Sequence, residues 1–139
     1  MEISLVRRRL AETIDRAKKQ AAERRERSDQ ASRDFEVFLQ KTAVPLFRQV
    51  ANALRADGHQ FTVFTPSGSV RLMSDRAAED YIEITLDTSD DPPRVMGQTS
   101  RNRGRRVIDA ERAIGAPDAM TEDAVLEFLL KELEAFVER

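Results

Sequence analysis

Small and apolar residues recur at helical spacing over roughly the first forty residues, a stretch with no glycine and no proline before Pro45. The large apolar side chains at its heptad positions are Ile3, Leu10, Ile14, Phe35 and Phe38. The middle of the stretch carries alanines, Arg24 and Ser28 at the same positions, so helices can pack closely there without much burial. Because alanine, glutamate, arginine and glutamine fill the remaining positions, we predict one long helix over residues 2–42.

Such a helix would be about 60 Å long and would overhang a body of about 97 residues, which should be only about 35 Å across. The alternative is a break at 28–32, where residues that cap helices cluster. That break would give two shorter helices folded onto the body. An overhanging arm with a narrow apolar stripe, by contrast, is suited to meeting another chain.

The period of the hydrophobic pattern changes after the arm. A second helix is predicted from Pro45 to Ala56, with its buried stripe formed by Leu46, Phe47, Val50 and Leu54. Alternating residues then predict five strands, at 61–64, 70–73, 81–86, 94–100 and 105–110. Thr121 is the N-cap candidate of a last helix. Its apolar face comprises Leu126, Leu129, Leu130, Leu133, Phe136 and Val137.

The predicted fold is therefore α+β: a long N-terminal helix, a second helix, a five-stranded antiparallel sheet built as a meander of hairpins, and a C-terminal helix packed on the sheet. On the third strand, Ile82, Ile84 and Leu86 share one face, and Tyr81, Glu83 and Thr85 share the face expected to meet solvent. Residues 1–42 form a helical arm, a coiled-coil-like segment for oligomerisation or docking, and residues 43–139 form a compact body.

Composition narrows the class of protein. Hydrophobic residues make up 40% of the 139 residues and charged residues 35%, which suits a soluble globular protein with exposed helices. The absence of cysteine excludes disulfides, thiolate zinc sites and cysteine nucleophiles. With no secretory leader pattern and no apolar stretch long enough to span a bilayer, we expect a cytoplasmic protein with no membrane partner. Arginine supplies 19 of the 23 basic residues, which favours a bacterial source.

No pattern points firmly to catalysis. His59 is the single histidine, and a general base or metal ligand needs partners that the sequence does not place beside it. Asp109 and Glu111 would project from one face of a strand, so a metal-dependent hydrolase that also uses His59 is the lowest-ranked alternative. Neither a glycine-rich phosphate loop nor a GxSxG motif is present. We therefore expect no enzyme activity, no metal and no cofactor.

The strongest local charge signal is the segment 100–106, a predicted hairpin with four arginines and no acid. These are Arg101, Arg103, Arg105 and Arg106. Three interpretations remain: a turn that is solvated or paired with the nearby Asp87, Asp90 and Asp91; contact with an acidic partner such as the C-terminal helix of another copy; or binding of nucleic-acid phosphates.

The sequence thus favours a small, non-enzymatic bacterial protein that interacts with or assembles onto other proteins through its N-terminal helix, either as a homo-oligomer or by docking to a larger partner. The residues expected to form the helix seam are Ile3, Leu10 and Ile14, and the four arginines are expected to form a charged contact. A nucleic-acid-associated regulator using the arginine-rich hairpin is the alternative.

Overall fold

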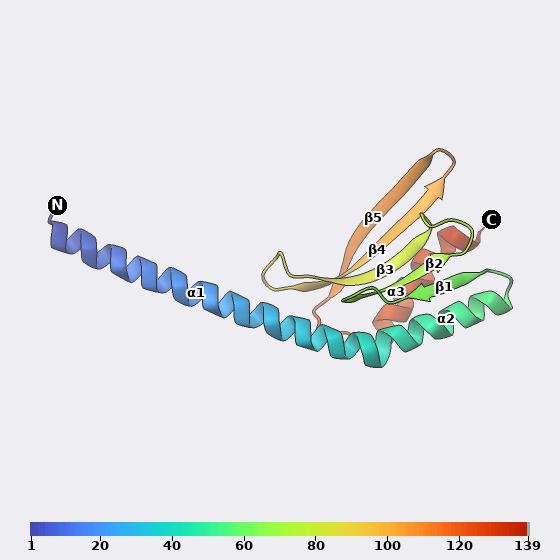
Figure 1. Ribbon diagram of the computed structural model, residues 1–139, viewed down its shortest axis with the longest axis horizontal. Helices are drawn as coiled ribbons and strands as arrows, with labels where there is room; N and C mark the ends of the chain where they lie inside the picture. Colours follow the sequence, from blue (N-terminus) through green and yellow to red (C-terminus); the bar gives the residue numbers. More distant parts are fainter. Residues whose placement is uncertain (139) are drawn as a thin grey trace.

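The computed structural model describes residues 1–138 and confirms the predicted α+β class (Figure 1). A long helix projects from a body in which further helices lie against one sheet. The elements in chain order are α1 (Ile3–Phe38), a π-helical segment (Leu39–Ala43), α2 (Val44–Ala56), β1 (Phe61–Phe64), β2 (Ser69–Ser74), β3 (Tyr81–Asp87), β4 (Arg94–Arg103), β5 (Arg106–Gly115) and α3 (Glu122–Val137).

Helix α1 continues without interruption through residues 28–32, so the alternative of two shorter helices is wrong. Its 36 residues span about 54 Å. Pro45 occupies the first turn of α2, as predicted. Because proline has no N–H to donate and its ring crowds the carbonyl four residues back, a wider π-helical turn joins α1 to α2 instead of a continuous α-helix. The chain changes direction at this joint (Figure 1).

The sheet is an antiparallel meander in which neighbouring strands follow chain order from β1 to β5. Its register places Ile82 of β3 opposite Leu72 of β2, and Ile84 opposite Val70. All four side chains have no exposed surface, and they define the helix-covered face of the sheet. The residues that alternate with them define the open face, which includes Arg71, Tyr81 and Glu83.

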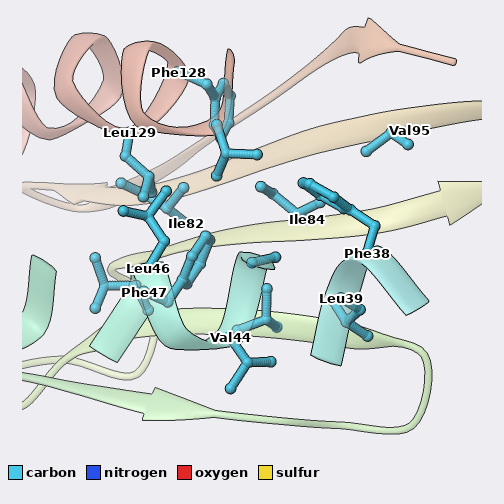
Figure 2. Packing of buried hydrophobic residues seen from close by; sticks show 14 of the residues in the cluster. Phe38, Leu39, Val44, Leu46, Phe47, Ile82, Ile84, Val95, Phe128 and Leu129 are labelled. Carbon is cyan, nitrogen blue, oxygen red and sulfur yellow. The ribbon is translucent and has the colours of Figure 1, made fainter. Parts of the chain in front are cut away.

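The core lies between the helix-covered face and the helices (Figure 2). Phe47 of α2 is fully buried there, and Phe35 and Leu39 contribute from the end of α1 and the π-helical segment. The core therefore draws on the last part of the arm predicted over residues 1–42. The part of α1 that stands outside the body is therefore the part N-terminal to Ala31, the first buried residue of the helix.

Helix α3 begins as predicted, because the Thr121 hydroxyl accepts a hydrogen bond of 3.1 Å from the Ala124 N–H. Its buried face differs in part from the prediction. Leu129 and Leu133 are buried, but Leu130 is 52% exposed, and Val125 and Phe128 take the remaining buried positions. Leu130 lies about 100° around the helix from Leu129 and so points away from the sheet.

The hairpin of β4 and β5 is longer than predicted, because both strands run to ten residues. Arg103 pairs with Arg106, so the turn consists of Gly104 and Arg105. Gly104 has a φ of +67° and Arg105 a negative φ, which fits a type II′ turn with glycine at its first central position. The end of this hairpin projects past the rest of the sheet (Figure 1).

Candidate interaction surfaces

The N-terminal part of α1 stands apart from the body. In residues 1–23, termed here the free segment, no residue is buried and all except Ala21 are exposed. The predicted seam residues Ile3, Leu10 and Ile14 are 71%, 57% and 44% exposed, respectively. Val6, which the sequence analysis did not single out, is 46% exposed. The free segment therefore presents an apolar surface that nothing within residues 1–138 covers.

These apolar side chains are aligned. At 100° per residue, Ile3, Leu10 and Ile14 lie within about 40° of one another around the helix. We call these three residues the apolar stripe. The side that meets the body, marked by the buried residues Ala31 and Phe35, is rotated from the stripe by less than about a quarter turn. The stripe thus faces the same side of the helix as the body, and it extends that contact surface beyond the sheet.

A bidentate ion pair joins α1 to the body upstream of Ala31, the first buried residue of the helix. Arg27 donates hydrogen bonds from Nε and Nη2 to Oδ1 and Oδ2 of Asp91, at 2.9 and 2.6 Å, respectively. These bonds hold the pKa of Asp91 below its usual range, and the nearby Arg24 acts in the same direction. Because the folded-state pKa is lowered, the contact is present at neutral pH and is lost as the pH falls through that lowered pKa.

The arginine hairpin, defined as Arg101, Arg103, Arg105 and Arg106, carries charges that residues 1–138 do not neutralise by ion pairs. Register places Arg103 directly opposite Arg106, and Arg101 opposite Ile108, on one face of the ribbon. Like charges that face each other across a strand pair repel, so this end of the hairpin favours an anionic neighbour.

The acidic loop between β3 and β4 does not provide that neighbour. Asp91 pairs with Arg27, Asp90 pairs with Arg94 at 2.8 Å, and Asp87 accepts hydrogen bonds from Ser89. The loop lies at one end of β4 and the arginine hairpin lies at the other. The interpretation in which these aspartates pair with the hairpin is therefore wrong.

Asp109 and Glu111 share the open face, as predicted, and line a shallow concavity of about 430 Å³ with Tyr81 and Gln98. Glu111 accepts a hydrogen bond of 3.3 Å from the Gln98 amide. His59 lies elsewhere, in a cavity of about 210 Å³ next to β1. Because β1 and β5 are the two edges of the sheet, four strand spacings separate them, about 19 Å.

The hydrolase alternative required Asp109, Glu111 and His59 to converge in one cleft, and the structure does not bring them together. Within residues 1–138 no group of three histidine, aspartate or glutamate side chains is placed to hold a metal ion. Arg112, which could have neutralised the two carboxylates, instead pairs with Glu132 of α3 at 3.3 Å.

The open face is less exposed to solvent than predicted. Glu83, expected to meet solvent, is only 7% exposed. Arg71 lies directly opposite it on β2 and donates a hydrogen bond of 2.8 Å from Nε, while its guanidinium stacks at 3.9 Å on the ring of Tyr81. The cross-strand register provides these partners, which cover the Glu83 side chain.

Sequence reasoning missed one residue near the arginine hairpin. Arg76, from the connection between β2 and β3, lines a concavity of about 370 Å³ together with Arg103 and Gly104. Asp80 lines the same concavity, and its carboxylate accepts a hydrogen bond of 2.6 Å from the Asn102 N–H. This bond fixes the base of the hairpin to the connection that carries Arg76. No local pattern around Arg76 signals this proximity, which depends on strand register.

Comparisons with protein-family models, with curated proteins and with solved structures find no match to this chain. Among the described residues, no helix combines the length and the apolar character needed to cross a lipid bilayer.

Proposed function

We propose that this protein is a small non-enzymatic assembly protein that self-associates through the free segment of α1. The observation that supports this most directly is the apolar stripe, three large side chains aligned on a helical segment that no other part of residues 1–138 covers. Exposed apolar surface of this kind is typical of interaction sites. Docking of the free segment to a larger protein is the other form of the same proposal.

The sequence of the free segment supports assembly in a second way. A helix that packs against nothing depends on intrinsic propensity, and here alanine, glutamate, arginine and lysine provide it. Such a helix is already ordered before it meets a partner. The free energy of association is therefore not reduced by the entropic cost of ordering the segment, which favours binding.

Solution mass tests the proposal, with the variants Leu10→Asp and Leu5→Asp as a matched pair. Both leucines are exposed, at 57% and 41%, but Leu5 lies on the opposite side of the helix from the apolar stripe. We expect light scattering after size exclusion to give a multiple of 15.8 kDa for the wild type and for Leu5→Asp. The Leu10→Asp variant should be monomeric, because its charge would be buried in the seam.

Unchanged circular dichroism would show that the body of each variant stays folded. If the wild type has a mass of 15.8 kDa throughout a concentration series, self-association is wrong. The same conclusion would follow if both leucine variants dissociated equally, since the effect would then not depend on the stripe.

A second candidate function rests on a different observation, the four arginines that form no ion pair within residues 1–138. In this alternative the arginine hairpin binds nucleic-acid phosphates. No aromatic side chain lies within the turn to stack on bases, so such binding would be independent of sequence.

Salt dependence tests this alternative with a double-stranded DNA oligonucleotide as the probe. Four phosphate contacts would make the affinity fall by about 100-fold between 50 and 200 mM salt, and replacing the four arginines with glutamine should abolish binding. A control variant removes the same number of positive charges from α1, at Arg8, Arg9, Lys18 and Lys19. If the control loses binding equally, or if the wild type does not bind, the hairpin is not a nucleic-acid site.

A further inference from the structure

We infer that the occupant of the apolar stripe is the free segment of a second copy, packed antiparallel about a two-fold axis near residue 12. This inference rests on the proposed function, takes its self-associating form, and adds an orientation and a register to it. In the proposed register, Leu10 of each copy lies opposite Ile14 of the other.

The register pairs large side chains with small ones. When Leu10 faces Ile14, Ile3 faces Ala21 and Arg7 faces Ala17. Two layers of large residues thus form the centre, and each end pairs an isoleucine with an alanine, which keeps the helices evenly spaced. The Arg7 stem can lie along the small Ala17 while its guanidinium reaches solvent. Each residue of the seam thereby faces a side chain of complementary size.

A parallel dimer is disfavoured by charge. In-register parallel helices would place Arg7 against Arg7 and Arg24 against Arg24 within the seam. Each pair brings two like charges into a contact that water only partly screens. The antiparallel register separates both pairs, and it leaves Arg24 outside the overlap.

The residues that flank the seam agree with the antiparallel arrangement. On one side Ser4 lies near Lys18 of the second copy, and on the other side Val6 lies near Gln20. At the two-fold axis, Thr13 lies next to Thr13 of the second copy. No like-charged pair occurs at these flanking positions, so Val6 gains apolar cover without an electrostatic cost.

The position of the seam along α1 agrees with the body of the protein. In this register the seam runs from Ile3 to Ala21 of each copy, within the part of α1 that has no buried residue. The next contact along α1 is the ion pair between Arg27 and Asp91, where the loop between β3 and β4 meets the helix. The apolar stripe of the second copy ends at Ile3, which faces Ala21, so the seam stops six residues short of Arg27 and this loop.

The absence of cysteine in the native chain allows a direct test with single-cysteine variants and a short bis-maleimide cross-linker. In the proposed dimer, residue 3 of one copy adjoins residue 21 of the other, while residues 21 and 21 are about 27 Å apart. We expect Ile3→Cys mixed with Ala21→Cys to cross-link, and Ala21→Cys alone to remain uncross-linked. Both substitutions keep the seam apolar, because a free cysteine packs as a small hydrophobic residue.

A matched control mixes Leu5→Cys with Lys19→Cys, which have the same axial separation but lie on the outer side of the helix. The expected yield of the seam pair is several-fold above this background. Efficient cross-linking of Ala21→Cys alone would show a parallel dimer and overturn the inference while leaving self-association intact. If light scattering shows a dimer but the seam pair stays at background, the stripe is not the interface. A monomeric wild type would instead refute the proposed function itself.

Discussion

The Phe47→Ala variant is expected to lose about 3–5 kcal/mol of unfolding free energy, the loss typical of removing a buried aromatic ring. Phe47 has no exposed surface, and it lies in the core between α2 and the helix-covered face of the sheet (Figure 2). Since small domains are stable by only about 5–15 kcal/mol, this loss is a large part of the total. Urea denaturation followed by circular dichroism would measure it.

Phe64→Ala is the matched control, because Phe64 lies on the open face and is 45% exposed. Its replacement should cost less than about 1 kcal/mol, as surface substitutions usually do. Similar losses for the two variants would contradict the assignment of the core to the helix-covered face.

Gly97→Ala is expected to destabilise the protein by about 1–3 kcal/mol, the range found when a packed core is overfilled. The ring of Phe128 lies against Gly97, so an added Cβ would overlap its Cζ and Cε1 atoms. The ring cannot easily move, because Phe128 of α3 is only 8% exposed and packs against β4. Without this contact, alanine would stabilise the strand slightly by restricting the unfolded chain.

A double-mutant cycle separates these two effects. In the Phe128→Ala background the space above residue 97 is open, so Gly97→Ala should become neutral or stabilising there. The coupling free energy between the two substitutions should therefore be stabilising, opposite in sign to the loss that Gly97→Ala causes alone. If Gly97→Ala costs the same with and without the Phe128 ring, the close contact is not the cause of the destabilisation.

The fold could be predicted from the sequence wherever local chemistry decides the structure. Helical propensity predicted α1, Pro45 the first turn of α2, Thr121 the start of α3, and alternation the five strands. The differences occur where distant residues decide. Leu130 fits the apolar pattern of α3 as well as Phe128 does, but the direction from which the sheet approaches buries one side chain and exposes the other.

The candidate interaction surfaces show the same division. The apolar stripe was evident from spacing alone, and the structure leaves it exposed. The partners of charged residues were not evident, because ion pairs join segments far apart in the chain. Arg27 and Asp91 are 64 residues apart in sequence, and Arg71 and Glu83 meet because strand register places them opposite each other. Periodicity fixes the face of the sheet on which a residue lies, but the residue opposite it also depends on the geometry of the turn.

The anchoring of α1 has a mechanical consequence. The helix is held near its C-terminal end from the ion pair at Arg27 to the buried ring of Phe38, a span of about three turns. About 36 Å of helix extends beyond Arg27 towards the N-terminus. A sideways force on the tip would act with a lever arm about twice as long as this anchored span. A small rotation of α1 at the core would therefore produce a larger displacement of its N-terminal tip.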